Sequence, residues 1–162
     1  MIELVPMTED DFAEFRAYTL TSFAHDKVQS GQWMPQEAQQ NASIGFQKLL
    51  PEGMATANHF FYSLVDPELS QSVGYIWFQI RGEGTGRDAF IFDHVIHEKF
   101  RNRGYGSQTH QAIDAKLLAM KVERVSTHVA AHNTTPLRLL ERVGYRVTGI
   151  DLSKRLREGE RG

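Results

Sequence analysis

The order of apolar and polar residues predicts two helices near the N-terminus. From Phe12 to Phe23, apolar side chains recur every three or four residues, the spacing of one buried helix face. The pattern Thr8-x-x-Asp11 precedes this run and resembles a helix-capping box with Asp in place of Glu. A weaker helical pattern follows from Gln36 to Leu50, with Pro35 suited to a first helical position.

The middle of the chain is rich in aromatic and β-branched residues, which favour strands. We predict strands at His59–Val65, Ser72–Ile80 and Asp88–Ile96. The glycine-rich stretch Arg81–Arg87 lies between the last two and is typical of a hairpin turn. A nucleotide-binding loop is the alternative interpretation of this stretch, but no helical pattern follows it.

Helical and strand patterns alternate in the last third of the chain. Helices are predicted at Ser107–Met120 and Thr134–Val143, and strands at Arg124–Val129 and Tyr145–Leu152. With a short first strand at Ile2–Val5, the order is β-α-α-β-β-β-α-β-α-β. The sequence therefore predicts one α/β (α+β) domain over residues 1–153, with a mixed central sheet flanked by helices. Residues 154–162 are expected to form a charged C-terminal tail.

Composition narrows the class of protein. The chain has 162 residues, 41% hydrophobic and 23% charged, as expected for one globular domain with one sizeable core. Eighteen basic against 20 acidic residues give no general reason to expect a nucleic-acid partner. We expect no membrane association and a cytoplasmic location, because no apolar run is long enough to span a bilayer and the acidic N-terminus lacks signal-peptide features. The absence of cysteine excludes disulfides, zinc–thiolate sites and thiol nucleophiles.

A glycine-bearing basic turn, Arg101-Asn102-Arg103-Gly104-Tyr105-Gly106, separates the apolar strand from the helix that follows. A strand, a glycine turn and a helix in this order direct several unpaired backbone N–H groups at an anion. Glycine lets the backbone approach a ligand closely, and the two arginines add positive charge. The pattern favours a phosphate-bearing ligand over a plain strand–helix turn. It lacks the Lys-Ser/Thr ending of a P-loop and the three-glycine spacing of a dinucleotide site.

The basic turn and a later run of the chain resemble two motifs of a known protein family. Arg101-x-x-Gly104-x-Gly106 resembles the Gln/Arg-x-x-Gly-x-Gly/Ala acyl-CoA motif of the GNAT superfamily of N-acetyltransferases. The run from His132-Asn133 to Val143-Gly144-Tyr145 is similar to the family's Asn-x-x-Ala-x-x-Leu-Tyr-Glu-x-x-Gly-Phe pattern. The predicted order of elements resembles that fold over almost the whole chain.

The resemblance implies an enzyme that transfers the acetyl group of acetyl-CoA to a primary amine. The acceptor would be a small molecule or a peptide, attacking the thioester directly in a ternary complex. A different acyl-CoA donor is the alternative to acetyl-CoA. Members of this fold commonly dimerise, so the resemblance also implies a homodimer as one option.

Carried over residue by residue, the resemblance assigns the donor site. The backbone around Val95 and Ile96 would pair with the pantetheine arm. Asn133 would contact the same arm where the strands of Ile96 and Val129 open; a plain helix N-cap is its other interpretation. The pyrophosphate would be held by the turn and the first helical residues, namely Arg101, Asn102, Arg103, Gly104, Tyr105, Gly106 and Ser107.

Acyl transfer to an amine needs a group that takes up the amine proton. His128 is the first candidate, because histidine titrates near neutrality and strand alternation separates its side chain from Thr127 and Val129. Family members that acetylate protein N-termini often carry a Glu at the matching position. Asp93, a carboxylate within an apolar strand, is the second candidate; His94 and His132 rank below it.

One position departs from the family pattern. Leu140 stands where the family's general-acid Tyr is expected, and leucine cannot donate a proton. The thiolate can leave without help, since thiols have pKa values near ~8.5. A non-catalytic acyl-CoA-binding module of the same fold is therefore the alternative function. A metal site is not expected, because no helical His-x-x-x-His pair or carboxylate cluster accompanies the histidines.

Overall fold

A computed structural model describes residues 1–156, which fold around one five-stranded sheet. The strands are β1 (Glu3–Pro6), β2 (His59–Asp66), β3 (Gln71–Arg81), β4 (Arg87–Ile96) and β5 (Val122–Thr127). They lie side by side in chain order; the first four are antiparallel and β5 is parallel to β4. The mixed sheet is as predicted. The helices are α1 (Glu9–Gln29), α2 (Pro35–Leu49), α3 (Tyr105–Ala119) and α4 (Thr134–Arg142).

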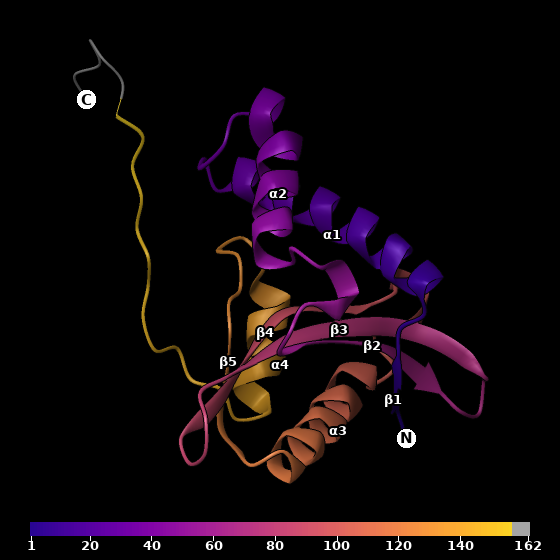
Figure 1. Ribbon diagram of the computed structural model, residues 1–162. Helices are drawn as coiled ribbons and strands as arrows, with labels where there is room; N and C mark the ends of the chain where they lie inside the picture. The colour runs from indigo at the N-terminus through magenta and orange to yellow at the C-terminus, as the bar shows by residue number, and fades with distance from the viewer. Residues whose placement is uncertain (157–162) are drawn as a thin grey trace.

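Helices cover both faces of the sheet, as Figure 1 shows, with α1 and α2 on one side and α3 on the other. Alternate residues of β3 point to opposite faces, so Trp77 packs among the α1 and α2 side chains. Its neighbours Ile76 and Phe78 pack against Ile113 and Leu117 of α3 instead. Burial on both sides explains why β3 reads as a nearly continuous apolar run.

Local signals in the sequence are confirmed at the starts of the first two helices. Thr8 and Asp11 exchange the two hydrogen bonds of a capping box, at 3.0 and 3.1 Å. Pro35 occupies the first position of α2, where its missing N–H has no helical partner to lose. The glycine-rich stretch after β3 forms the predicted hairpin turn to β4.

The predicted last strand, Tyr145–Leu152, is wrong. These residues run out from the body as extended chain without strand pairing, and every residue from Arg146 to Leu156 is exposed (Figure 1). A strand needs a partner for its backbone groups, and the described chain places none beside this segment. Other differences are small: α3 begins two residues earlier than predicted, and β5 both begins and ends two residues earlier. Of the predicted tail 154–162, residues 157–162 lie outside the described part.

Among residues 1–156, no helix combines the length and the apolar character that crossing a bilayer requires.

Candidate active site

The candidate site lies where β4 and β5 separate. The two strands pair from Arg87 with Val122 as far as Ile91 with Thr127. The Thr127 hydroxyl donates a 2.9 Å hydrogen bond to the Ile91 carbonyl at the end of this pairing. Beyond that point, residues 92–96 of β4 pair only with β3 within the described chain. The outer edge of β4 is therefore open, as predicted from the family resemblance.

A bulge in β4 places a carboxylate beside this opening. Trp77 pairs with Asp93 and Phe78 with Ile91, so Phe92 is the extra residue. As a result Phe92 and Asp93 both point to the α1 side of the sheet: Phe92 stacks on Trp77 at 4.4 Å, and Asp93 accepts a hydrogen bond from Thr19 of α1. Bulges commonly re-aim side chains next to active sites.

The environment of Asp93 alters its acidity. The Thr19 hydroxyl donates to Asp93 Oδ2 at 2.8 Å. Burial disfavours the charged carboxylate and raises the pKa of Asp93 to about 6, although hydrogen bonds from Thr19 and the His94 backbone oppose the rise. The negative charge of Asp26 raises it further. A carboxylate with a pKa near 6 is ionised at neutral pH and is a stronger base than an ordinary Asp.

Aromatic side chains surround this carboxylate on the α1 side. Tyr75 is buried, and its ring packs edge-on against Tyr18 at 5.9 Å between centroids. Burial and then the charge of Asp93 raise the pKa of the Tyr75 phenol, which keeps the phenol neutral. Tyr18 is 45% exposed, so this side of the site reaches the surface of α1.

The basic turn connects the C-terminal end of β4 to α3. Gly104 has φ +82° at the N-cap of α3, a left-handed conformation that favours glycine. The first bond into the helix runs from Gln108 N to the Gly104 carbonyl, at 3.2 Å. The amides of Tyr105, Gly106 and Ser107 therefore lack helical acceptors, as in any first helical turn. Together with the helix dipole, they make this helix start a suitable anion site.

Three side chains of the basic turn make contacts within the protein. Arg101 is exposed, and its Nε donates a 3.0 Å hydrogen bond to the Ile96 carbonyl. The Arg103 guanidinium lies 5.8 Å from the centre of the Phe100 ring. The Tyr105 phenol points away from the turn and donates a 2.5 Å hydrogen bond to Asp66. This bond lowers the pKa of Asp66. Tyr105 can thus offer a ligand only its backbone.

The two family motifs meet through α4. A β-carbon at Gly106 would lie 2.7 Å from Leu139 Cδ2, so glycine permits close approach of α4 to α3. Asn133 is the N-cap residue of α4, as expected, but its side chain makes no capping hydrogen bond. The loop before it reaches across to α1, where His132 Nε2 lies 3.0 Å from Asp26 Oδ1. The half-buried Asn133 side chain therefore has no capping partner in α4.

The histidine candidates lie in different environments. His128 follows the last residue of β5 and is exposed. His94 points to the α3 face, opposite to Asp93, and stacks edge-on against His110 at 4.9 Å. Burial lowers the pKa of His94 to about 3, so this imidazole stays neutral.

The position of the expected general acid holds a buried leucine. Leu140 is 9% exposed and belongs to the buried apolar residues. Tyr145 packs against His110 of α3, with ring centroids 5.7 Å apart. Burial raises the pKa of the Tyr145 phenol to about 12. Tyr145 therefore packs against α3 and does not act as the acid.

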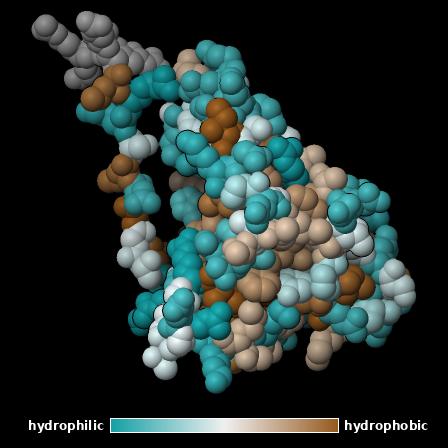
Figure 2. Space-filling view, in the orientation of Figure 1, coloured by the Kyte–Doolittle hydropathy of each residue, from teal (hydrophilic) through white to brown (hydrophobic). Residues whose placement is uncertain are grey.

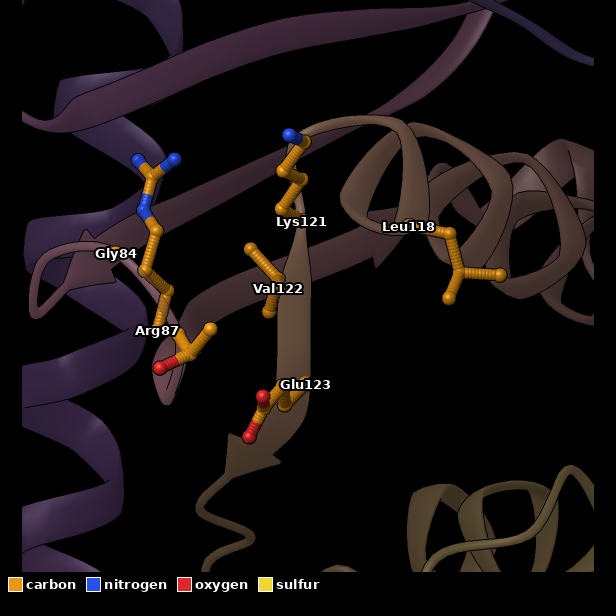
Figure 3. Close-up of a pocket in the computed structure, with 7 residues that line it drawn as sticks. Gly84, Arg87, Leu118, Lys121, Val122 and Glu123 are labelled. Carbon is orange, nitrogen blue, oxygen red and sulfur yellow. The ribbon is translucent and has the colours of Figure 1, made fainter.

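A pocket of about 500 Å³ lies elsewhere, at the start of β4 and β5 (Figure 3). Ten residues of β4 separate it from the basic turn, a distance of roughly 30 Å at strand spacing. The Arg87 guanidinium in this pocket already donates a 3.0 Å hydrogen bond to the Met120 carbonyl. Its lining residues are Gly84, Thr85, Arg87, Leu118, Lys121, Val122 and Glu123. This pocket is not part of the candidate site.

Sequence reasoning missed two participants, Thr19 of α1 and Tyr75 of β3. Thr19 lies on the helix face that the spacing of apolar residues predicts to be buried. No local pattern shows that a hydroxyl on α1 meets a carboxylate 74 residues later. A polar residue on an otherwise apolar helix face was the available signal.

Comparisons with known proteins agree with this geometry. A model described as the acetyltransferase (GNAT) family matches residues 21–145. The chain is 36% identical over 155 residues to the uncharacterized N-acetyltransferase YycN of Bacillus subtilis (strain 168), covering 96% of this chain and 99% of YycN. It is 29% identical over 153 residues to YdgE of the same organism, an uncharacterized N-acetyltransferase, covering 94% and 97%.

Solved structures show the same fold. The crystal structure of YycN superposes with a TM-score of 0.91 at 35% identity, covering 98% of this chain and 100% of that one. An aminoglycoside acetyltransferase from an uncultured soil sample, solved with sisomicin, has a TM-score of 0.59 at 11% identity, covering 96% and 97%. The second likeness concerns the fold alone. The chain belongs to the GNAT family of acetyltransferases and is an acetyl-CoA-dependent acyltransferase.

Proposed function

We propose that this enzyme acetylates a primary amine by direct attack of the amine on acetyl-CoA in a ternary complex, with Asp93 as the base. The observation that carries the proposal is the position of Asp93, at the bulge where the outer edge of β4 opens. A thioester lying along that edge would have the carboxylate on its α1 side and the basic turn at its phosphate end.

The donor would be held as the resemblance implies. The pyrophosphate fits the first-turn amides of α3 with Arg101 and Arg103 beside them. The Ile96 N–H, on the open edge of β4, would pair with the pantetheine arm, because the Val95 backbone pairs with Tyr75 of β3 and the Ile96 carbonyl already accepts from Arg101. The Asn133 amide would contact the same arm from the opposite wall.

The need for a base depends on the acceptor. For a lysine-like amine with pKa ~10.4, deprotonation at pH 7 costs about 4.6 kcal/mol, against about 1 kcal/mol for an α-amino group near ~7.8. The ammonium first gives one proton to Asp93, and the neutral nitrogen then attacks the thioester carbonyl. The C–S bond breaks as the nitrogen, now part of the tetrahedral intermediate, gives its second proton to solvent. Without a phenol at Leu140, we propose that the CoA thiolate leaves unassisted and takes a proton from solvent.

Charge on the α1 side favours a cationic acceptor. The charge of Asp26 on α1 acts on Asp93, and Glu14 and Tyr18, which are exposed on α1, act on Tyr75. Carboxylates attract an ammonium group before it loses its proton. A small-molecule or peptide amine would therefore enter from α1. The cytoplasmic location stays a prediction.

The test is release of free thiol from acetyl-CoA in the presence of a panel of primary amines. Wild-type enzyme should release thiol above background with at least one lysine-type or polyamine acceptor. An Asp93→Asn variant should lose most of this rate, whereas His128→Ala should retain it within about threefold. A strong loss of rate in His128→Ala, with a near wild-type rate in Asp93→Asn, would identify His128 as the base. Binding of acetyl-CoA with no turnover for any amine would favour the non-catalytic module.

A further inference from the structure

The opening between β4 and β5 has two walls that the sheet itself does not hold together. Pairing of the two strands ends with Ile91 and Thr127, so β4 continues as one wall and the loop of residues 128–133 forms the other. In Figure 1 the chain after β5 rises toward the α1–α2 side of the sheet before it turns back into α4. Within residues 1–156, side-chain contacts therefore have to fix the distance between the walls.

Helix α1 contacts both walls with side chains on one of its faces. Thr19 donates a 2.8 Å hydrogen bond to Asp93 of β4. Further along the helix, Asp26 Oδ1 lies 3.0 Å from Nε2 of His132 in the loop. Positions i and i+7 of a helix are about two turns apart and lie on the same face. One face of α1 thus joins the β4 wall to the loop wall.

A tight turn connects His132 to the start of α4. The Asn133 N–H donates a 2.9 Å hydrogen bond to the Ala130 carbonyl, which closes the loop around His132. Asn133 is the N-cap of α4, and its side chain makes no capping hydrogen bond. His25 of α1 adds a second contact, with its ring edge-on to that of His132 at 6.3 Å between centroids. A shift of His132 would therefore move Asn133 with it.

The contact between Asp26 and His132 lies at the surface of the molecule. The His132 side chain is 34% exposed and that of Asp26 30%. Figure 2 shows mostly hydrophilic residues on the part of the surface where α2 lies, at the top of the view. A charged pair in contact with water contributes little to the stability of a fold. We therefore expect loss of this contact to alter the opening more than the stability of the protein.

We propose that Asp26 and His132 are positioning residues: their contact holds the β5–α4 loop against α1, sets the width of the opening and places Asn133 against the pantetheine arm of acetyl-CoA. The inference rests on the donor site of the proposed function and does not require Asp93 to be the base. The charge of Asp26 does reach Asp93, since it raises the pKa of that carboxyl. A neutral or a protonated imidazole can make the contact, because either form has an N–H to donate.

Calorimetry of acetyl-CoA binding across a double-mutant cycle tests this contact. Asp26→Ala and His132→Ala should each weaken binding by about three- to fivefold, the effect expected when a half-exposed charged pair is lost. The double variant should bind no more weakly than either single variant, because the same contact is already gone. The exchanged pair Asp26→His/His132→Asp should restore the affinity to within about twofold of wild type. Asp10→Ala, which removes an exposed carboxylate at the start of α1, is the matched control and should bind as wild type does.

Urea unfolding of the same variants separates positioning from general destabilisation. Their unfolding midpoints should stay close to that of wild type, because the lost contact is half-exposed. Additive losses of affinity in the double variant, or no recovery in the exchanged pair, would overturn the inference. A loss of affinity that follows a lower unfolding midpoint would assign the pair to the fold and would overturn it as well.

The variant Asn133→Ala distinguishes failure of the inference from failure of the donor site. Normal acetyl-CoA affinity in Asn133→Ala would show that the donor site is wrong, and the inference would fall with it. Weak binding in Asn133→Ala, with normal binding in both Asp26→Ala and His132→Ala, would show that only the inference is wrong.

Discussion

The Thr19 hydroxyl of α1 donates a 2.8 Å hydrogen bond to Asp93 of β4 at the bulge where the sheet opens. This hydrogen bond links α1 to β4, the strand along which the thioester is expected to bind. The hydrogen bond stabilises the ionised form of a carboxylate, whereas burial disfavours that form. The balance of the two effects leaves Asp93 with a pKa of about 6, which suits proton transfer near neutrality.

Replacing Asp93 with Asn should lower kcat by about a hundredfold or more for a lysine-type acceptor, the range typical of a lost acid–base group. The side chain keeps its size, and its amide oxygen can still accept from Thr19. Steady-state kinetics with thiol detection measure the effect. Asp88→Asn, at the opposite end of β4, is the control and should stay near wild type. A decrease below threefold in Asp93→Asn would remove Asp93 from the mechanism.

The fall in kcat/KM at acidic pH should reflect protonation of Asp93. Asp93 must be ionised to accept a proton, so kcat/KM should rise with pH through an apparent pKa near 6. Thr19→Val removes a hydrogen bond that lowers this pKa, and should move the rise to higher pH by up to about one unit. Ser at position 19 should restore the wild-type profile. An unchanged profile in Thr19→Val would separate the contact from catalysis.

Stability should depend on pH in the opposite sense to activity. The folded-state pKa of Asp93 is raised above its ordinary value, so the native protein binds the extra proton between about pH 4 and pH 6. The contribution of Asp93 to the free energy of unfolding is therefore fully present below pH 4. It is lost as pH rises through 6, because the buried carboxyl then has to ionise. Asp93→Asn should stabilise the fold at pH 7 by up to about 3 kcal/mol.

Urea unfolding of both proteins at pH 4 and pH 7 checks this expectation. The advantage of Asp93→Asn should be large at pH 7 and nearly absent at pH 4. An equal difference at both pH values would mean that the carboxylate is not penalised by burial.

Arg101 should act through the pyrophosphate alone. Arg101→Ala should weaken acetyl-CoA binding by about tenfold, as expected for loss of a hydrogen bond to a charged group. Turnover of acetyl-pantetheine, which lacks the pyrophosphate, should not change. Calorimetry gives the affinity, and Arg81→Ala, an exposed arginine at the end of β3, is the matched control. Equal losses with both donors would show that Arg101 supports the fold of the turn instead.

Asn133 offers a clear separation between a ligand role and a capping role. Because its side chain makes no capping hydrogen bond, Asn133→Ala should change the unfolding free energy by less than about 0.5 kcal/mol. The same change should raise KM for acetyl-CoA severalfold. The reverse result, a loss of about 1 kcal/mol in stability with normal KM, would identify Asn133 as a helix cap only.

Much of this architecture could be predicted because its signals are local. Helix spacing, the capping box at Thr8 and the glycines of the basic turn all lie within a few residues of the structure they specify. The Thr19–Asp93 contact could not be predicted, since it depends on a bulge and on packing between distant elements. The strand at Tyr145–Leu152 was wrong for a related reason. Its β-propensity is real, but a strand forms only where a partner lies beside it.

The central claim is acetyl transfer to an amine with Asp93 accepting the proton. It is tested most directly by mass spectrometry of the amine panel after incubation with acetyl-CoA and either wild-type enzyme or Asp93→Asn. We expect an acetylated primary amine, formed in step with free CoA thiol, at a rate at least tenfold lower in the variant. Equal product from both proteins, or thiol release without any acetylated amine, would contradict the claim.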